Sequence, residues 1–169
     1  MKKIGILSDT HSFLLPQMFD FFKDVDEIWH AGDFGNIETV ENLQKFKPLR
    51  GVSGNIDDAQ LHRYFPMFNL FDIEDVKVLM THIGGYPAHY PAHVKKLILT
   101  EKPNIFVAGH SHILKIIYDQ QHQLLFINPG AAGISGFHQR ITAVRFTVEG
   151  KKFSDMEIFE TQKVMPENF

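Results

Sequence analysis

The first half of the chain alternates short apolar runs with segments of helical periodicity. The apolar runs at residues 3–7, 26–30 and 49–52 predict buried strands, and each stops on polar residues. Residues 14–25 and 37–46 carry apolar positions three or four residues apart, which is the spacing of an amphipathic helix. This half is therefore predicted to alternate strand and helix.

The second half consists mainly of apolar runs paired across polar turns. Three pairs predict hairpins, at residues 67–73 with 76–80, 114–118 with 124–127, and 141–148 with 153–159. A helix at 94–100 and a buried strand at 105–108 lie among them, and Asn128-Pro129-Gly130 predicts a tight turn.

Strand–helix alternation followed by hairpins predicts an α/β fold: two mixed sheets packed face to face, with helices outside. No linker, internal repeat or low-complexity segment interrupts the pattern. We therefore expect one domain over residues 1–169, with 161–169 as a frayed tail.

Composition narrows the class of protein. A chain of 169 residues can bury a core without cross-links, and the absence of cysteine excludes a disulfide scaffold, a thiolate metal site and a cysteine nucleophile. Lys and Arg number 17 against 20 Asp and Glu, so no overall basic field favours nucleic acid. No apolar run approaches the roughly 20 residues of a membrane span, and the first residues lack a signal-peptide core. A cytoplasmic location is therefore expected.

Candidate chemistry is concentrated where the apolar runs end. Five polar tips follow predicted strands: Asp9-Thr10-His11, Gly32-Asp33, Gly54-Asn55, Thr81-His82 and Gly109-His110-Ser111-His112. Sites in α/β sheets form beyond the carboxyl ends of strands. In an extended segment, Asp-x-His and His-x-His would place both side chains on one side, and the glycines would allow sharp turns and close approach of the ions.

The tips supply seven candidate ligands with nitrogen or oxygen donors: Asp9, His11, Asp33, Asn55, His82, His110 and His112. Such donors suit Mn²⁺, Fe, Ni²⁺ or Zn²⁺. Seven ligands exceed the need of one tetrahedral ion and suit two ions that share Asp33. Two divalent ions, two aspartates and one hydroxide leave a site charge of about +1, which attracts an anion. Two ions roughly 3.5–4 Å apart can clamp a phosphoryl group and bring the pKa of water towards about 7.

These motifs, in this order, resemble the motif set of the calcineurin-like metallophosphoesterases. The similarity runs from about residue 3 to 130 and is greatest to the small phosphodiesterases of the YfcE/MJ0936 type. It implies a four-layer α/β/β/α sandwich. It also implies that one ion is held by Asp9, His11, Asp33 and His112, and the other by Asp33, Asn55, His82 and His110, with Asp33 bridging. The family's chemistry is in-line attack of metal-bound hydroxide on a phosphoester.

The chain departs from the family pattern twice. Many members have His after Gly-Asn, where it serves as leaving-group acid or stabilises the transition state; this chain has Ile56-Asp57, as the small subgroup also lacks that His. We expect Asp57 to bond Asn55 or to cap the next turn. Many members also follow the metal-binding His with Gly-His, whereas Ile83 follows His82 here. His89 and His93 lie nearby in sequence, but neither is assigned that role.

The other histidines are expected to be structural. His30 is expected to pack at a strand end, with orientation of a ligand as the alternative. His62, His122 and His138 are expected to be solvated or structural.

The expected function is a binuclear metal-dependent phosphodiesterase acting on a small phosphodiester. Asp33, Asn55 and His82 are expected at the catalytic centre, with Asn55 also contacting substrate. Mn²⁺ is the first choice of metal, with Ni²⁺, Zn²⁺, Fe or Mg²⁺ as alternatives. The alternatives are a phosphomonoesterase or nucleotide phosphatase, and a metal-binding interaction scaffold, a role that the retromer subunit of this fold exemplifies. A scaffold would be expected to have lost ligands, and all seven are present. No membrane or nucleic-acid partner is expected, and the family suggests self-association.

Overall fold

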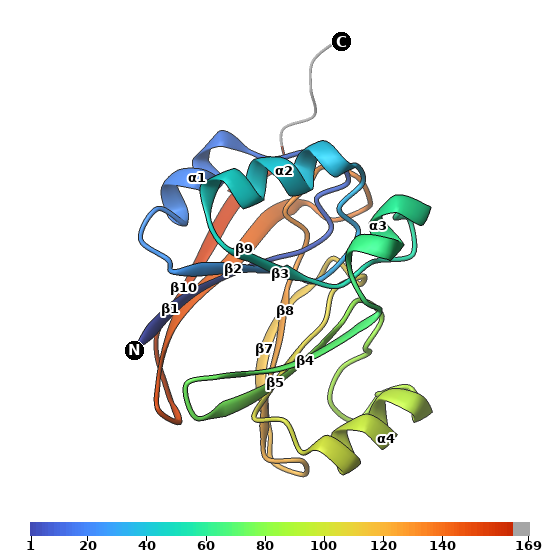
Figure 1. Cartoon of the computed structure of the whole chain (residues 1–169), viewed down its shortest axis with the longest axis vertical. Coiled ribbons are helices and arrows are strands. Elements are labelled where there is room, and N and C mark those ends of the chain that lie inside the picture. The colour runs from blue at the N-terminus through green and yellow to red at the C-terminus, as the bar shows by residue number, and fades with distance from the viewer. Residues whose placement is uncertain (164–169) are drawn as a thin grey trace.

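The computed structural model describes residues 1–163, which form two five-stranded sheets (Figure 1). The first sheet has the order β10-β9-β1-β2-β3 and contains β1 (Lys2–Leu7), β2 (Glu27–His30), β3 (Leu49–Gly51), β9 (Arg140–Glu149) and β10 (Lys152–Gln162). The second has the order β4-β5-β6-β8-β7 and contains β4 (Phe68–Ile73), β5 (Val76–Thr81), β6 (Ile105–Val107), β7 (Leu114–Asp119) and β8 (Leu124–Pro129).

Both sheets are mixed. Strands β1, β2 and β3 run parallel, whereas β9 and β10 join them antiparallel. In the second sheet β5, β6 and β8 run parallel between the antiparallel strands β4 and β7. Parallel neighbours bring their carboxyl ends to a common edge, so the polar segments that follow them start side by side.

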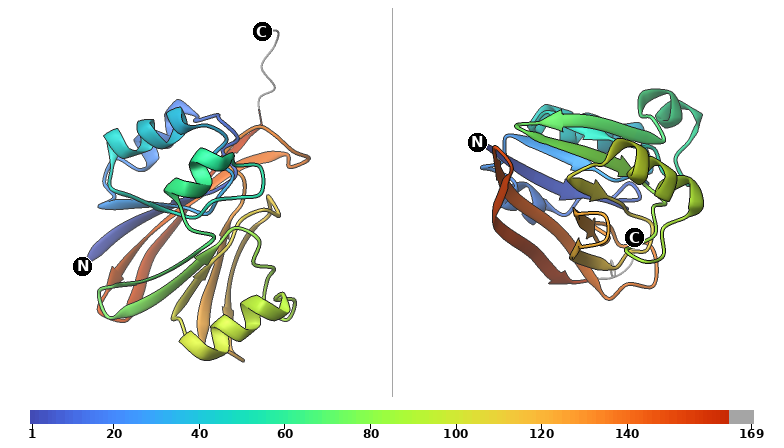
Figure 2. Two further views of the ribbon diagram at one scale, coloured as in Figure 1. Left: turned by 45° about the vertical axis from the view of Figure 1, so that its right-hand side comes forward. Right: turned by 90° about the horizontal axis from the view of Figure 1, so that it is seen from below.

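Helices cover the outer faces of the two sheets (Figures 1 and 2). Helices α1 (Pro16–Phe21) and α2 (Ile37–Phe46) lie over the first sheet, and α4 (Ala92–Glu101) lies over the second. The short helix α3 (Ala59–Tyr64) connects β3 to β4. The arrangement is the predicted four-layer sandwich of two mixed sheets flanked by helices.

Strand periodicity divides the core among three clusters. Ile4 and Ile6 of β1 and Val78 of β5 face the layer between the sheets, where Trp29 is fully buried. Leu7 faces α1 and α2, whereas Leu79 packs under α4. Both faces of these strands are buried, which explains why their sequences are continuous apolar runs.

The structure corrects several predicted boundaries. The helix predicted at 14–25 spans only Pro16–Phe21: proline occupies its first turn and the chain turns after Phe22. Phe22 and Val25 are nevertheless buried, so their spacing reports burial rather than helix. Helix α3 was not predicted, because its six residues give too short a periodic signal.

The ends of two strands also differ from the prediction. Strand β10 extends through Gln162, beyond the start of the predicted frayed tail at Thr161; residues 164–169 of that tail lie outside the described residues. Asn128 and Pro129 belong to β8, and the turn begins at Gly130, whose φ is 72°. Among residues 1–163, no helix has the length and apolar character needed to cross a membrane.

Candidate metal centre

The candidate ligands lie on five segments that follow β1, β2, β3, β5 and β6. Backbone hydrogen bonds hold these segments to one another after the strands end. The amides of Asp9 and His11 donate to the carbonyls of Gly32 (3.0 Å) and Asp33 (3.1 Å). In the second sheet the amide of Gly109 donates to the carbonyl of His82 at 2.9 Å. The loops are thus fixed extensions of the sheets rather than free connections.

The backbone at these tips is not extended, contrary to the prediction. Five of the seven candidate ligands have positive φ: Asp9 (53°), His11 (45°), Asp33 (58°), His110 (69°) and His112 (60°). The left-handed region costs a non-glycine residue roughly 1–2 kcal/mol. Asp-x-His and His-x-His therefore bring their side chains together through tight left-handed turns, and the prediction of strand alternation there was wrong. Strain of this kind gathers at functional sites.

At two glycines of the centre, neighbouring atoms lie so close that there is no room for a Cβ. A Cβ on Gly54 would collide with the carboxylate and backbone nitrogen of Asp33. A Cβ on Gly109 would collide with the Ser8 hydroxyl and the Ala31 carbonyl oxygen, and would lie 3.0 Å from Asp9 Oδ2. At these positions glycine makes room for close-packed side chains and backbone, and its role in the approach of ions stays a prediction.

Six of the seven predicted ligands form two clusters. One ligand atom from each member lies within 4.8 Å of the others in the group Asp9, His11 and His112, and likewise in the group Asp33, His82 and His110. This division matches the two ligand sets that the family resemblance implied. Each group combines one carboxylate with two imidazoles.

Asp33 lies between the two groups. Its Oδ2 is 3.1 Å from His82 Nε2 in its own group and 3.4 Å from His11 Nε2 in the other. Asp9 Oδ1 is 3.1 Å from His112 Nε2 and 3.8 Å from His82 Nε2. The clusters thus share one continuous set of polar atoms, and Asp33 Oδ2 lies close to a histidine of each.

Three of the converging atoms lack hydrogen-bond partners. Among the described residues, Asp9 Oδ1, His11 Nε2 and His82 Nε2 are buried side-chain atoms without one. An unpartnered buried polar atom costs roughly 1–3 kcal/mol, so native proteins rarely keep several together. Because these are a carboxylate oxygen and imidazole nitrogens aimed at one space, the residues fit a divalent cation.

The remaining carboxylate oxygens are fixed by protein donors. Asp9 Oδ2 accepts from the Ser8 hydroxyl (2.6 Å) and from the amide of His110 (3.1 Å). Asp33 Oδ1 accepts from the amide of Ile56 at 3.1 Å. Each aspartate therefore has one oxygen held in place while the other faces the centre, as expected of an oriented ligand.

The imidazole tautomers are fixed as well. His82 Nδ1 donates to the carbonyl oxygen of Ala31 at 2.7 Å, which leaves its Nε2 lone pair free. His138 Nε2 donates to the carbonyl oxygen of Gly133 at 2.8 Å, so its Nδ1 accepts from His112 Nδ1 at 3.1 Å. The Nε2 lone pair of His112 is then free to face Asp9. Burial lowers the pKa of His138, which favours the neutral imidazole that this hydrogen bond requires.

The charges of the metal-free centre are strongly coupled. The neighbouring Asp33 carboxylate raises the pKa of His11. Burial opposes a charge on His82, but the carboxylates of Asp33 and Asp9 outweigh it and raise its pKa. Burial alone would raise the pKa of Asp33, but the imidazoles of His11 and His82 hold its pKa well below the usual range. Without a metal, the two carboxylates therefore favour the protonated forms of His11 and His82, and a metal would compete with those protons.

Asn55, the seventh candidate ligand, offers an amide oxygen rather than a carboxylate or an imidazole. It is exposed on the segment after β3, next to Gly54, and lines a cavity together with His82. Its assignment as a ligand and a substrate contact stays a prediction.

Four residues outside the ligand set position the segments of the centre, and the sequence analysis gave only His30 an orienting role, as an alternative to packing. His30 is fully buried and stacks on Phe34 with ring centroids 3.7 Å apart. Its Nδ1 accepts from the amide of Gly32 (3.1 Å) and its Nε2 donates to Thr10 Oγ1 (2.9 Å). It therefore connects the segments that carry Asp9 and Asp33, besides packing as predicted.

The other three are His138, Asp57 and Asn128. Asp57 neither bonds Asn55 nor caps a helix: its carboxylate accepts from the amides of Gly35 (2.9 Å) and Gly54 (2.8 Å), and Asp58 caps α3 instead. The Asn128 amide nitrogen donates to the Gly109 carbonyl (3.0 Å), which secures the segment before His110. Of these three, only Asp57 offered a sequence signal, because it comes two residues after Asn55.

The comparisons with known proteins agree with this geometry. The family profile described as the calcineurin-like phosphoesterase superfamily domain matches residues 1–151. A probable metallophosphoesterase of Methanothermobacter thermautotrophicus is 29% identical over 167 residues, covering 94% of this chain and 92% of the relative. Phosphodiesterase MJ0936 of Methanocaldococcus jannaschii is 25% identical over 144 residues, covering 76% of this chain and 82% of the relative.

A solved structure of Vps29 from Chaetomium thermophilum is similar in fold, with a TM-score of 0.75 at 13% identity, covering 97% of this chain and all of that one (100%). The chain belongs to the calcineurin-like phosphoesterase superfamily, and the predicted resemblance is confirmed. It is a metallophosphoesterase, a metal-dependent hydrolase of phosphate esters.

Proposed function

We propose that the chain is a binuclear phosphodiesterase that hydrolyses a small phosphodiester. The observation that carries the proposal is the pair of Asp/His clusters with Asp33 between them and three unpartnered donor atoms facing inward. A single ion would leave part of this donor set without a role. The name of the relative MJ0936 favours a diester as the substrate.

Each residue of the centre has a part in this proposal. Asp9, His11, Asp33 and His112 would hold one divalent ion, and Asp33, Asn55, His82 and His110 the other. Two bound ions would supply a nucleophilic oxygen at neutral pH and would neutralise charge on the phosphoryl group. Against the two aspartates they leave a net positive site in a chain of net charge −3, which attracts a phosphate anion locally. Asn55, exposed beside His82, would contact a phosphoryl oxygen.

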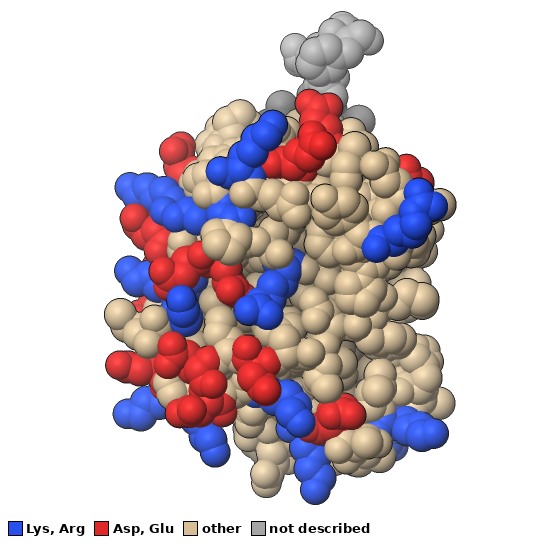
Figure 3. Space-filling view, in the orientation of Figure 1, with Lys and Arg blue, Asp and Glu red and all other residues tan. Residues whose placement is uncertain are grey.

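We propose Mn²⁺ as the metal, with Ni²⁺, Zn²⁺, Fe and Mg²⁺ as the ions to compare. Imidazole, carboxylate and amide donors with no thiolate suit this group of ions. No long nucleic acid is proposed as substrate, because acidic and basic side chains alternate over the face seen in Figure 3 rather than forming a basic stripe. Self-association and a cytoplasmic location stay predictions.

The experiment compares a chromogenic phosphodiester with its matching monoester. Protein stripped with chelator is reloaded with each ion in turn, and bound metal is counted beside turnover. The expected result is diester hydrolysis that requires about two ions per chain. Faster monoester hydrolysis would replace the proposal with a phosphomonoesterase, and turnover that is complete with one ion would refute the binuclear mechanism.

A scaffold is the second candidate, because the fold is similar to that of Vps29. The complete set of seven candidate ligands argues against it. Two bound ions without turnover of any phosphoester, together with stable association with a protein partner, would favour the scaffold.

A further inference from the structure

A cavity of about 280 Å³ opens directly beside the candidate metal centre. His82, Gly54 and Asn55 line one side of it, so it is continuous with the centre. The rest of its wall comes from four places in the fold: helix α3, the start of β4, the segment after β5, and the start of α4. A group attached to a phosphorus atom at the centre can therefore enter the cavity.

Much of the remaining lining is apolar. It contains Met67, Phe68 and Ile83, and the His93 ring meets the Phe68 ring edge-to-face with centroids 5.9 Å apart. Met67 is 65% exposed and Ile83 is 46% exposed, although both are large apolar side chains. Exposed apolar side chains gathered around a concave site indicate a ligand surface.

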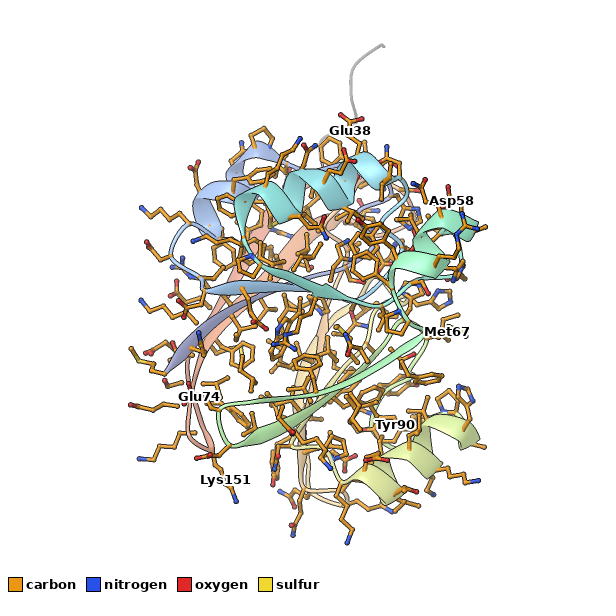
Figure 4. The ribbon with its side chains drawn as sticks, viewed as in Figure 1. Glu38, Asp58, Met67, Glu74, Tyr90 and Lys151 are labelled. Carbon is orange, nitrogen blue, oxygen red and sulfur yellow. The ribbon has the colours of Figure 1, made fainter. Side chains whose placement is uncertain are left out.

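The surrounding surface supports the same conclusion. In Figure 4, Met67 lies at the start of β4, between α3 above and α4 below. Figure 3 shows the surface between these two helices to be almost free of Lys, Arg, Asp and Glu, whereas charged side chains crowd the opposite side of that view. An entrance of this kind suits an uncharged apolar group better than a second phosphate or a sugar.

We infer that this cavity binds an aromatic ester group of the substrate, which makes the substrate an aryl phosphodiester or a diester with another flat ring. The inference rests on the proposed function and names the substrate class of that site. A cavity of roughly 150 Å³ is enough to hold benzene, so about 280 Å³ accommodates one substituted ring. Sulfur and ring edges, as Met67, Phe68 and His93 provide, are favourable neighbours for an aromatic face.

The test uses two phosphonates that differ only in the apolar group, phenylphosphonate and methylphosphonate. Their binding to the Mn²⁺-loaded protein is measured by calorimetry, which does not depend on turnover. Burial of a ring of this size predicts that phenylphosphonate binds about 10- to 100-fold more tightly. Ile83→Ser and Met67→Ser should each reduce this ratio severalfold and leave the affinity for methylphosphonate unchanged.

The control is Ile158→Ser on β10, because Ile158 is 48% exposed and thus closely matched to Ile83 but lies on the other sheet. It should leave the phenyl-to-methyl ratio unchanged. Equal affinity for the two phosphonates, or a ratio that Ile83→Ser and Met67→Ser both leave intact, would overturn the aromatic subsite while the proposed function stands. Failure of both phosphonates to bind protein that holds two ions would overturn the proposed function, and the subsite with it.

Discussion

Neutral His30 should make the stability of the metal-free protein fall with acidification. Its ring is fully buried, stacks on Phe34 and accepts a hydrogen bond from Gly32. Burial lowers its pKa from 6.5 to about 3. Between these values the unfolded chain binds a proton on this residue that the folded chain does not bind. The free energy of unfolding therefore rises with pH through this window and is lost as pH falls.

The size of the effect follows from the two pKa values. Each pH unit well inside the window changes the free energy of unfolding by about 1.4 kcal/mol. Relative to pH 7, the penalty from His30 is therefore about 2 kcal/mol at pH 5 and about 4 kcal/mol at pH 3. Other titrating groups add their own slopes, so the effect of His30 is isolated as a difference between variants.

His30→Gln removes the titrating group and retains a side chain that can accept and donate. We expect it to be less stable than the wild type at pH 7, because the ring stack is lost. Its free energy of unfolding should nevertheless fall by about 2 kcal/mol less between pH 7 and pH 5. Urea unfolding in the presence of chelator, followed by the fluorescence of buried Trp29, measures both values. His89→Gln, at an exposed histidine, is the control. Equal pH slopes for the wild type and His30→Gln would refute a buried neutral imidazole.

Four further predictions concern the candidate centre. Asp33→Asn should lower turnover by orders of magnitude and reduce bound metal, measured by metal analysis beside the diester assay; full turnover with two ions bound would contradict the bridging role. His138→Ala should weaken metal binding by about 10- to 100-fold, because nothing then fixes the His112 tautomer; competition with a metal-sensitive dye reports this, and unchanged affinity would show that the hydrogen bond is dispensable. Gly54→Ala should displace the Asp33 carboxylate and lower both Tm and metal content, and a variant that matches the wild type in both would contradict the close contact. Mn²⁺ at about 100 times its Kd should stabilise the fold by about 2.7 kcal/mol and raise Tm by several degrees, whereas an unchanged Tm would mean that no site forms.

The sequence predicted the layers because the inner strands of both sheets, such as β1, β5 and β6, are largely buried on two faces. Runs such as residues 3–7 and 105–108 are apolar throughout, which distinguishes them from amphipathic helices. The pattern failed where local rules compete with burial. Phe22 and Val25 keep helical spacing after α1 has ended, since both contribute to the same cluster. Helix α3 begins after its N-cap Asp58, and a single capping residue is too little sequence evidence to predict a helix.

The candidate ligands were predictable because each ends an apolar run, but their geometry was not. Periodicity carries no information about a left-handed residue, so the turns at Asp9 and His11 were assigned to extended backbone. His138 follows β8 by several residues and shows its role only through its contact with His112. A residue that orients a ligand from another loop stands at no fixed distance from that ligand along the sequence. One sequence alone therefore gives no pattern that identifies it.

The strain and the unpartnered atoms of the centre have a common explanation. Five ligand residues in the left-handed region cost the metal-free fold several kcal/mol at roughly 1–2 kcal/mol each, and three orphaned donor atoms add to this cost. The two sheets supply the stability that offsets this cost, because their inner strands are largely buried and backbone hydrogen bonds join the segments that follow them. The hydrogen bonds that fix each aspartate and imidazole hold these atoms in one place, and a divalent cation is a partner that could satisfy all of them at once. The fold is therefore less stable at these segments than it could be, and in exchange the ligand atoms stay in place for a metal.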